Sequence, residues 1–91
     1  MAVNVRIPGP LRNYTSGKAE VELEAASIKT LLEQLQGSYR ELFGRICEAD
    51  GSLRRFVNVY VNDEDIRFLS NLDTPLKPGD HVSIIPAIAG G

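Results

Sequence analysis

The sequence predicts an α+β domain in which a helix packs on one face of a sheet. Apolar and polar residues alternate near both ends of the chain and around residue 60, which is the pattern of half-buried strands. Between residues 28 and 46 the apolar residues instead recur every three or four positions, as they do along one face of a helix. The resulting order is strand, strand, helix, strand, short strand, strand, which defines the class.

The first two strands are expected at residues 3–7 and 19–24. The first alternates Val and Ile with polar residues, and the Pro-Gly-Pro run at 8–10 ends it because proline lacks a backbone N–H. Residues 13–17 are expected to form a loop. The second strand carries glutamates on its outer face, and a connection this short predicts that the two strands are antiparallel.

The main helix is expected to begin after Ser27, whose hydroxyl is a suitable N-cap. Four apolar residues follow it at helical spacing: Ile28, Leu31, Leu32 and Leu35. Gly37 is well placed to end this helix. A second stripe with the same spacing predicts another short helix: Tyr39, Leu42, Phe43 and Ile46.

The strongest strand pattern covers residues 56–61. Its three valines are expected to face the core: Val57, Val59 and Val61. The residues that alternate with them are then expected to face away: Phe56, Asn58 and Tyr60. A polar turn at 62–65 precedes a brief strand expected at 66–68, and a last strand is expected at 81–85 with Val82 and Ile84 on one face.

The bulk composition fits one soluble domain. The chain has 91 residues, of which 43% are apolar and 24% are charged, and such a chain buries a single modest core. Its net charge of -2 argues against nucleic acid as the main partner, because phosphate backbones are bound by excess Lys and Arg. The single cysteine, Cys47, cannot form an internal disulfide. With no recognisable signal peptide and no apolar run of roughly 20 residues, we expect a cytoplasmic protein without membrane contact.

Side-chain chemistry for catalysis or metal binding is sparse. One histidine and one cysteine are too few for a Cys/His zinc site. A nucleophilic pair of Cys47 and His81 competes with the commoner explanations, a buried thiol and a surface imidazole. The acidic run at 62–65 lacks the spacing of a calcium loop, so a solvated turn is favoured over an acidic docking patch for a basic partner. No glycine-rich phosphate loop is present, so we expect no bound ATP, metal or other cofactor.

The chain ends in a segment of small, uncharged residues: Ala87, Ile88, Ala89, Gly90 and Gly91. We expect a domain at 1–86 and a flexible tail at 87–91. Two terminal glycines leave a bare carboxylate on a thin thread, which suits entry into a narrow site of another protein. Chance is the alternative, since a random Gly-Gly end occurs on the order of once in two hundred chains.

A patch of three larger side chains is a candidate partner interface. If the valines of residues 56–61 face the core, Phe56, Tyr60 and Ile85 lie together on the opposite face of the sheet. Exposed aromatic and aliphatic side chains of this kind indicate a protein interface. The alternative is that a loop or the second helical segment covers them.

Two stretches resemble the MoaD/ThiS family of ubiquitin-like sulfur carriers. They are residues 55–67 and the ending at 78–91, with its pattern Gly-Asp-x-Val-x-Ile-x-Pro-Ala-x-Ala-Gly-Gly. Within the family the chain is most similar to the CysO-type carriers of cysteine biosynthesis. The resemblance implies a β-grasp (ubiquitin-like) fold, a mixed sheet around the main helix with the first and last strands side by side in parallel.

The resemblance also implies a carrier that acts as a cosubstrate rather than an enzyme. A ubiquitin-activating-like enzyme would use ATP to adenylate the Gly91 carboxylate, and a sulfur donor would displace AMP to leave a thiocarboxylate. Gly90 with Ala87, Ile88 and Ala89 would thread into the partner, where small side chains suit a closed, water-poor channel. The sulfur would then pass to an acceptor enzyme.

Several acceptors and one other class of function remain open. CysO-type carriers supply sulfur to a cysteine synthase-like enzyme, and a metalloprotease then releases the cysteine. MoaD-type carriers serve the large subunit of molybdopterin synthase, and ThiS-type carriers serve thiamine synthesis. A ubiquitin-like modifier would instead use Gly91 to form an isopeptide bond to lysines. A binding module with an incidental Gly-Gly is the remaining alternative.

Overall fold

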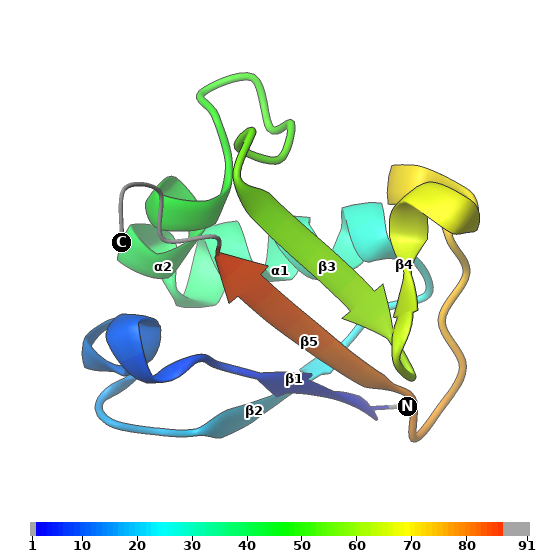
Figure 1. The fold of residues 1–91 in the computed structure, drawn as a ribbon. Coiled ribbons are helices and arrows are strands. Elements are labelled where there is room, and N and C mark those ends of the chain that lie inside the picture. The colour runs from blue at the N-terminus through cyan, green and yellow to red at the C-terminus, as the bar shows by residue number, and fades with distance from the viewer. Residues whose placement is uncertain (1, 87–91) are drawn as a thin grey trace.

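A five-stranded mixed sheet forms the centre of the structure, a computed structural model that describes residues 2–86 (Figure 1). The strand order is β2-β1-β5-β3-β4, so the last strand in the sequence is the middle strand of the sheet. The bounds are β1 Ala2–Arg6, β2 Glu20–Glu24, β3 Val57–Val61, β4 Glu64–Asp65 and β5 His81–Pro86. β1 is antiparallel to β2 and parallel to β5, whereas β3 is antiparallel to both β5 and β4. These pairings confirm the α+β class, the antiparallel first hairpin and the parallel contact between the first and last strands.

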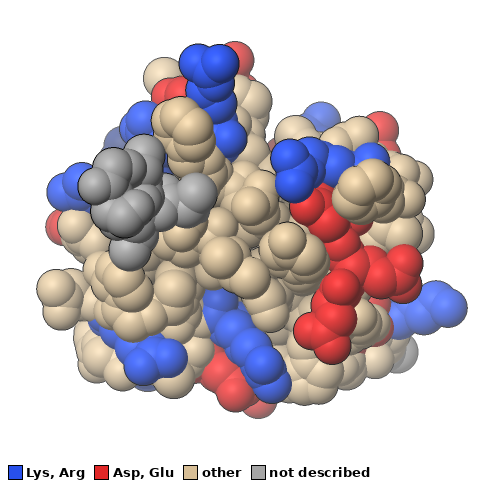
Figure 2. All heavy atoms as spheres, in the orientation of Figure 1, with Lys and Arg blue, Asp and Glu red and all other residues tan. Residues whose placement is uncertain are grey.

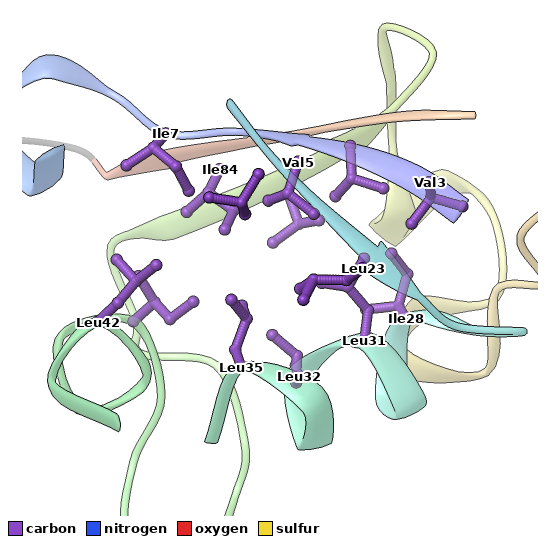
Figure 3. Close-up of a cluster of buried hydrophobic side chains, with 14 of the residues drawn as sticks. Val3, Val5, Ile7, Leu23, Ile28, Leu31, Leu32, Leu35, Leu42 and Ile84 are labelled. Carbon is purple, nitrogen blue, oxygen red and sulfur yellow. The ribbon is translucent and has the colours of Figure 1, made fainter. Parts of the chain in front are cut away.

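Two helices, α1 (Ile28–Ser38) and α2 (Arg40–Ile46), cover one face of this sheet (Figure 1). Every second residue of the longer strands is buried against them: Val3, Val5, Val21, Leu23, Val59, Val61, Val82 and Ile84. Figure 3 shows the side chains of β1 and β5 pointing toward the leucines of the helices. Full burial of one such side chain contributes about 1.5–3 kcal/mol, so this layer holds the domain together. None of the described helices is long and apolar enough to cross a membrane.

The predicted start of α1 is confirmed, but its end is not where the sequence indicates. Ser27 has an extended backbone, and its Oγ accepts a hydrogen bond from the backbone N–H of Thr30 at 3.2 Å, as an N-cap does. The helix continues to Ser38, and the N–H of Tyr39 donates to the carbonyl of Leu35 at 2.7 Å. Gly37 therefore lies within the last turn, and the prediction that it ends the helix is wrong.

The segment after β1 is a 3-10 helix, η1 (Gly9–Thr15), where a loop was predicted at 13–17. Proline is tolerated in the first turn of a helix, so the Pro-Gly-Pro run ends the strand without preventing a helix. Leu11 is buried, and the hydroxyl of Thr15 donates to carbonyl oxygens of Arg12 and Lys18. These contacts order a segment whose composition is typical of a loop.

The expected strand at 66–68 is also wrong, because the strand ends earlier. β4 stops at Asp65, whose carboxylate accepts a hydrogen bond from the N–H of Arg67 at 2.8 Å and caps a 3-10 helix, η2 (Ile66–Phe68). A further short 3-10 helix, η3 (Asn71–Asp73), follows. Phe56, expected as the first residue of the preceding strand, lies in the turn before β3.

Candidate functional site

The central strand β5 positions the end of the described chain. It pairs with β1 on one side and with β3 on the other, and its last residue, Pro86, lies opposite Val57. Val82 and Ile84 anchor it to the core on the helical face of the sheet, and their exposed fractions are 0% and 2%. The last described residue therefore lies at the end of the middle strand of the sheet. The predicted tail residues are outside the described residues: Ala87, Ile88, Ala89, Gly90 and Gly91.

The start of β5 is fixed by the turn at Asn62 and Asp63, which lies within the polar turn predicted at 62–65. The β3–β4 hairpin has Asn62 and Asp63 at its centre, with φ angles of 49° and 72°, and Asn and Asp tolerate this left-handed region better than most residues. The Asn62 side chain accepts a hydrogen bond from the N–H of His81 at 2.9 Å and donates to Asp80 Oδ1 at 3.0 Å. One amide therefore links the hairpin to the strand that carries the tail.

Asp80 completes this link from the other side. Its Oδ2 accepts a hydrogen bond from the backbone N–H of Lys77 at 2.8 Å. This hydrogen bond, followed by the one from the Asn62 amide, lowers the pKa of the Asp80 carboxyl below its ordinary value. The signal in the sequence was the Gly-Asp pair immediately before an alternating strand, but its partner 18 residues earlier was not predictable from spacing.

The outer face of the sheet, opposite the helices, carries the predicted partner patch. Ile85 is 47% exposed on this face and Tyr60 is partly buried, whereas Phe56, 54% exposed, lies in the turn before β3 and not in the strand itself. Ile85 lies opposite Asn58 in the strand pairing, and Tyr60 lies opposite Ser83, so all four are on this face. Figure 2 shows largely uncharged surface over β3 and β5, with Lys and Arg above and below it and acidic side chains to the right. The two apolar side chains are accessible to a partner, while their role as an interface stays a prediction.

The acidic stretch at 62–65 is not simply a solvated turn. Asp65 is 7% exposed at its side chain and forms an ion pair with Arg67, whose Nη2 lies 2.7 Å from Asp65 Oδ2. The hydrogen bonds from the Arg67 side chain lower the pKa of the Asp65 carboxyl. Asp63 and Glu64 remain exposed beside it. Among the described residues no group of three or more His, Cys, Asp or Glu side chains is arranged to hold a metal ion.

Cys47 and His81 do not form a catalytic pair. Cys47 follows α2 and is buried, whereas His81 is exposed and opens β5 at the end of the sheet away from α2 (Figure 1). Burial raises the pKa of the Cys47 thiol to about 11, and the nearby Arg54 only partly offsets this effect. A thiol with such a pKa is almost entirely protonated at neutral pH, which is the opposite of an activated nucleophile.

Comparison with known proteins places this fold and its C-terminal strand in one family. The model of the ThiS family matches residues 5–91, which is nearly the whole chain. The chain belongs to the ThiS family. The sulfur carrier protein CysO of Mycobacterium tuberculosis is 41% identical over 93 aligned residues, and the alignment covers all of both chains. A putative sulfur carrier protein of Archaeoglobus fulgidus is 32% identical over 91 residues, again with full coverage of both.

Solved structures of ThiS-family relatives have the same ubiquitin-like β-grasp fold. The crystal structure of a BexX/CysO complex from Amycolatopsis orientalis contains a chain that matches with a TM-score of 0.89 and 40% identity, covering 99% of this chain and 100% of that one. CysO of Mycobacterium tuberculosis matches with a TM-score of 0.85 and 39% identity, covering 94% and 99%. The predicted resemblance and fold are confirmed. Sulfur carrier proteins of this kind are small carriers rather than catalysts.

The Asp80 link gives a pH-dependent prediction for the stability of this ThiS-family domain. Because the folded-state pKa of Asp80 is lowered, its contribution to stability is complete above the ordinary pKa and is lost as pH falls through the folded value. We expect Asp80→Asn to lower the free energy of unfolding at pH 7 by about 1 kcal/mol, since one of two hydrogen bonds loses its acceptor. The difference in the free energy of unfolding between the wild type and this variant should narrow toward pH 3, as measured by urea unfolding across the pH range.

Asp73→Asn is the matched control, because it removes the same charge from an exposed position in η3. It should change the free energy of unfolding by less than about 0.5 kcal/mol at every pH. An Asp80→Asn variant that parallels the wild-type curve from pH 7 to pH 3 would contradict the role given to this carboxylate.

Proposed function

We propose that this chain is a sulfur carrier whose Gly91 carboxylate becomes a thiocarboxylate and supplies sulfur for cysteine synthesis. The observation that supports it most is the end-to-end similarity to CysO, at 41% identity with no part of either chain left over. The described structure adds a physical reason. A strand held in the middle of a sheet presents its C-terminal extension from a rigid base, and the two exposed apolar residues beside it, Phe56 and Ile85, offer a docking surface.

In this proposal the partner enzymes catalyse each step, and the reacting group of this chain is the carboxylate of Gly91. A carboxylate is a poor electrophile, so an oxygen of Gly91 first attacks the α-phosphate of ATP and releases pyrophosphate, which gives an acyl-adenylate. Sulfide then adds to the acyl carbon and AMP leaves, which gives the thiocarboxylate. An E1-like enzyme would hold the ATP. Ala87, Ile88, Ala89 and Gly90 would pass through its channel, because three of these four residues have no side chain larger than a methyl group.

The acceptor in this proposal is an activated serine bound to a cysteine synthase-like enzyme. The thiocarboxylate sulfur would displace the activating group, and a rearrangement would leave cysteine joined to the tail until a metalloprotease releases it. Molybdopterin synthase and the thiamine pathway are the other acceptors that the family resemblance implies. The similarity to CysO favours cysteine over both. We place the protein in the cytoplasm, where its single cysteine, Cys47, would stay reduced.

Intact-mass analysis tests the carrier chemistry directly. After incubation with its E1-like enzyme, ATP and sulfide, the full chain should gain the mass difference of one oxygen exchanged for sulfur. A variant without Gly91 should keep its original mass under the same conditions. Transfer is then followed by adding a cysteine synthase-like enzyme with activated serine, which should yield a cysteinyl adduct. An unmodified full chain in the presence of an active cognate enzyme would exclude sulfur carriage.

Modification of other proteins is the second candidate, and one comparison favours it. Small archaeal modifier protein 3 of Haloferax volcanii is 38% identical over 66 residues, covering 72% of this chain and 71% of that one. In that case Gly91 would form an isopeptide bond to lysines of targets. Discrete higher-mass bands that resist reducing agents and disappear when Gly91 is deleted would support conjugation.

The docking part of the proposal is tested at Ile85. We expect Ile85→Glu to slow thiocarboxylate formation about tenfold, because it places a charge in the centre of the apolar contact. Gln34→Glu, on an exposed position of α1 behind the sheet, adds the same charge and should leave the rate within about twofold. The rate is measured by mass spectrometry over time, with thermal unfolding to verify that both variants are folded. Equal rates for the two variants would remove Ile85 from the interface.

A further inference from the structure

One half of β3 has no strand partner on its outer side. β4 contributes only two residues, and these pair with Tyr60 and Val61. Among the described residues, no strand lies on that side of Val57, Asn58 or Val59. The N–H of Val57 already donates to the carbonyl of Arg54 at 3.0 Å, so the Val57 carbonyl and Val59 remain for an added strand. An unpaired stretch of strand at a sheet edge presents backbone donors and acceptors, and an extended peptide can add to it as a further strand.

A groove lies along this open half of β3. It has a volume of about 320 Å³ and runs between the loop before β3 and the two 3-10 helices that follow β4. Apolar side chains from all three segments line it: Leu53, Val57, Val59, Ile66 and Leu72. Leu53, Val57 and Leu72 are only partly buried, so each offers contact area to an occupant. An added strand points alternate side chains toward such a groove.

The charge around the groove is opposite to that of the whole chain. Three arginines and one aspartate line it, Arg54, Arg55, Arg67 and Asp65, and with the ion-pair partner Glu48 included the local formal charge is +1, where the full chain carries -2. Arg54 is paired with Glu48 at 3.2 Å, and Arg67 with Asp65. Within the described part of the chain Arg55 makes no ion pair, and its guanidinium lies over the ring of Phe56 at 5.9 Å. The groove is therefore complementary to carboxylates.

From this combination we propose that the β3 groove binds an extended, acidic segment of a partner protein, added as a strand to Val57–Val59 with its carboxylates near Arg55. Val57 lies opposite Pro86, the last described residue of β5. An added strand would run two strand spacings, about 10 Å, from β5. The partner would thereby hold the domain beside the point where the tail leaves it. This site adjoins the apolar outer face, since Asn58 lines both and Arg55 lies over Phe56, but it does not depend on what chemistry occurs at Gly91.

The test uses the full chain, labelled with nitrogen-15, and a capped hexapeptide that alternates Asp and Val. We expect saturable amide shifts for residues 53–59 and 66–72, with a dissociation constant of about 0.1–1 mM. The peptide that alternates Lys and Val should bind at least about tenfold more weakly. Two N-methylated forms of the acidic peptide, at every Val or at every Asp, block opposite edges of its strand. One form should bind like the parent peptide. The other, whose blocked edge faces β3, should lose about tenfold or more in affinity.

Variants of the protein separate the groove from general charge effects. Arg55→Glu should weaken the acidic peptide about tenfold, because it reverses the charge at the proposed contact. Arg40→Glu makes the same change at an exposed position of α2 and should alter binding by less than about twofold. Shifts confined to β2 or to the outer face, equal binding of the acidic and basic peptides, equal binding of both N-methylated forms, or no saturable shift at about 5 mM would each overturn the proposal.

Discussion

The pairing of β5 with both β1 and β3 is the constraint on which the rest of the structure depends. A parallel neighbour such as β1 requires the intervening chain to cross over one face of the sheet, and here that crossing contains both helices and the β3–β4 hairpin. The buried residues of β5, Val82 and Ile84, then pack against helices that come from the middle of the sequence. The last strand cannot be removed without separating the two hairpins on either side of it.

In this arrangement the two faces of the sheet differ in what covers them. The helical face is packed with aliphatic side chains and with the thiol of Cys47, and the β3 groove opens only at its margin, beside Val57 and Val59. Among residues 2–86 no layer covers the outer face, and Ile85 is exposed there next to the final residue of β5, while Phe56 is exposed in the turn before β3. When a partner covers exposed apolar side chains of this size, their surface is removed from water, and this burial stabilises the complex. For the proposed carrier, stability and recognition are therefore assigned to opposite faces.

Much of the sheet could be predicted from the sequence because its signal is local. The alternation of Val57, Val59 and Val61 correctly identified the buried face, and Ser27 correctly identified the start of α1. The errors fall where a distant or side-chain contact decides the backbone. The carboxylate of Asp65 converts an expected strand into η2, and the link from Asn62 to Asp80 joins residues 18 positions apart. Neither the open edge of β3 nor the groove beside it has any periodic signal, since both result from the shortness of β4.

The low reactivity of the Cys47 thiol is consistent with the proposal that the reactive group of this chain is the Gly91 carboxyl. A thiolate near neutral pH attacks acyl and disulfide groups, and so would compete with the sulfur donor for an activated carboxylate. Burial keeps the Cys47 thiol protonated, with a pKa of about 11, and the core side chains around it block access. His81 is exposed at the far end of β5 and is not positioned to deprotonate it. Neither Cys47 nor His81 therefore takes part in the proposed sulfur chemistry, which occurs at the Gly91 carboxyl. The choice of partner enzyme then depends on which enzymes recognise the surfaces beside the end of β5.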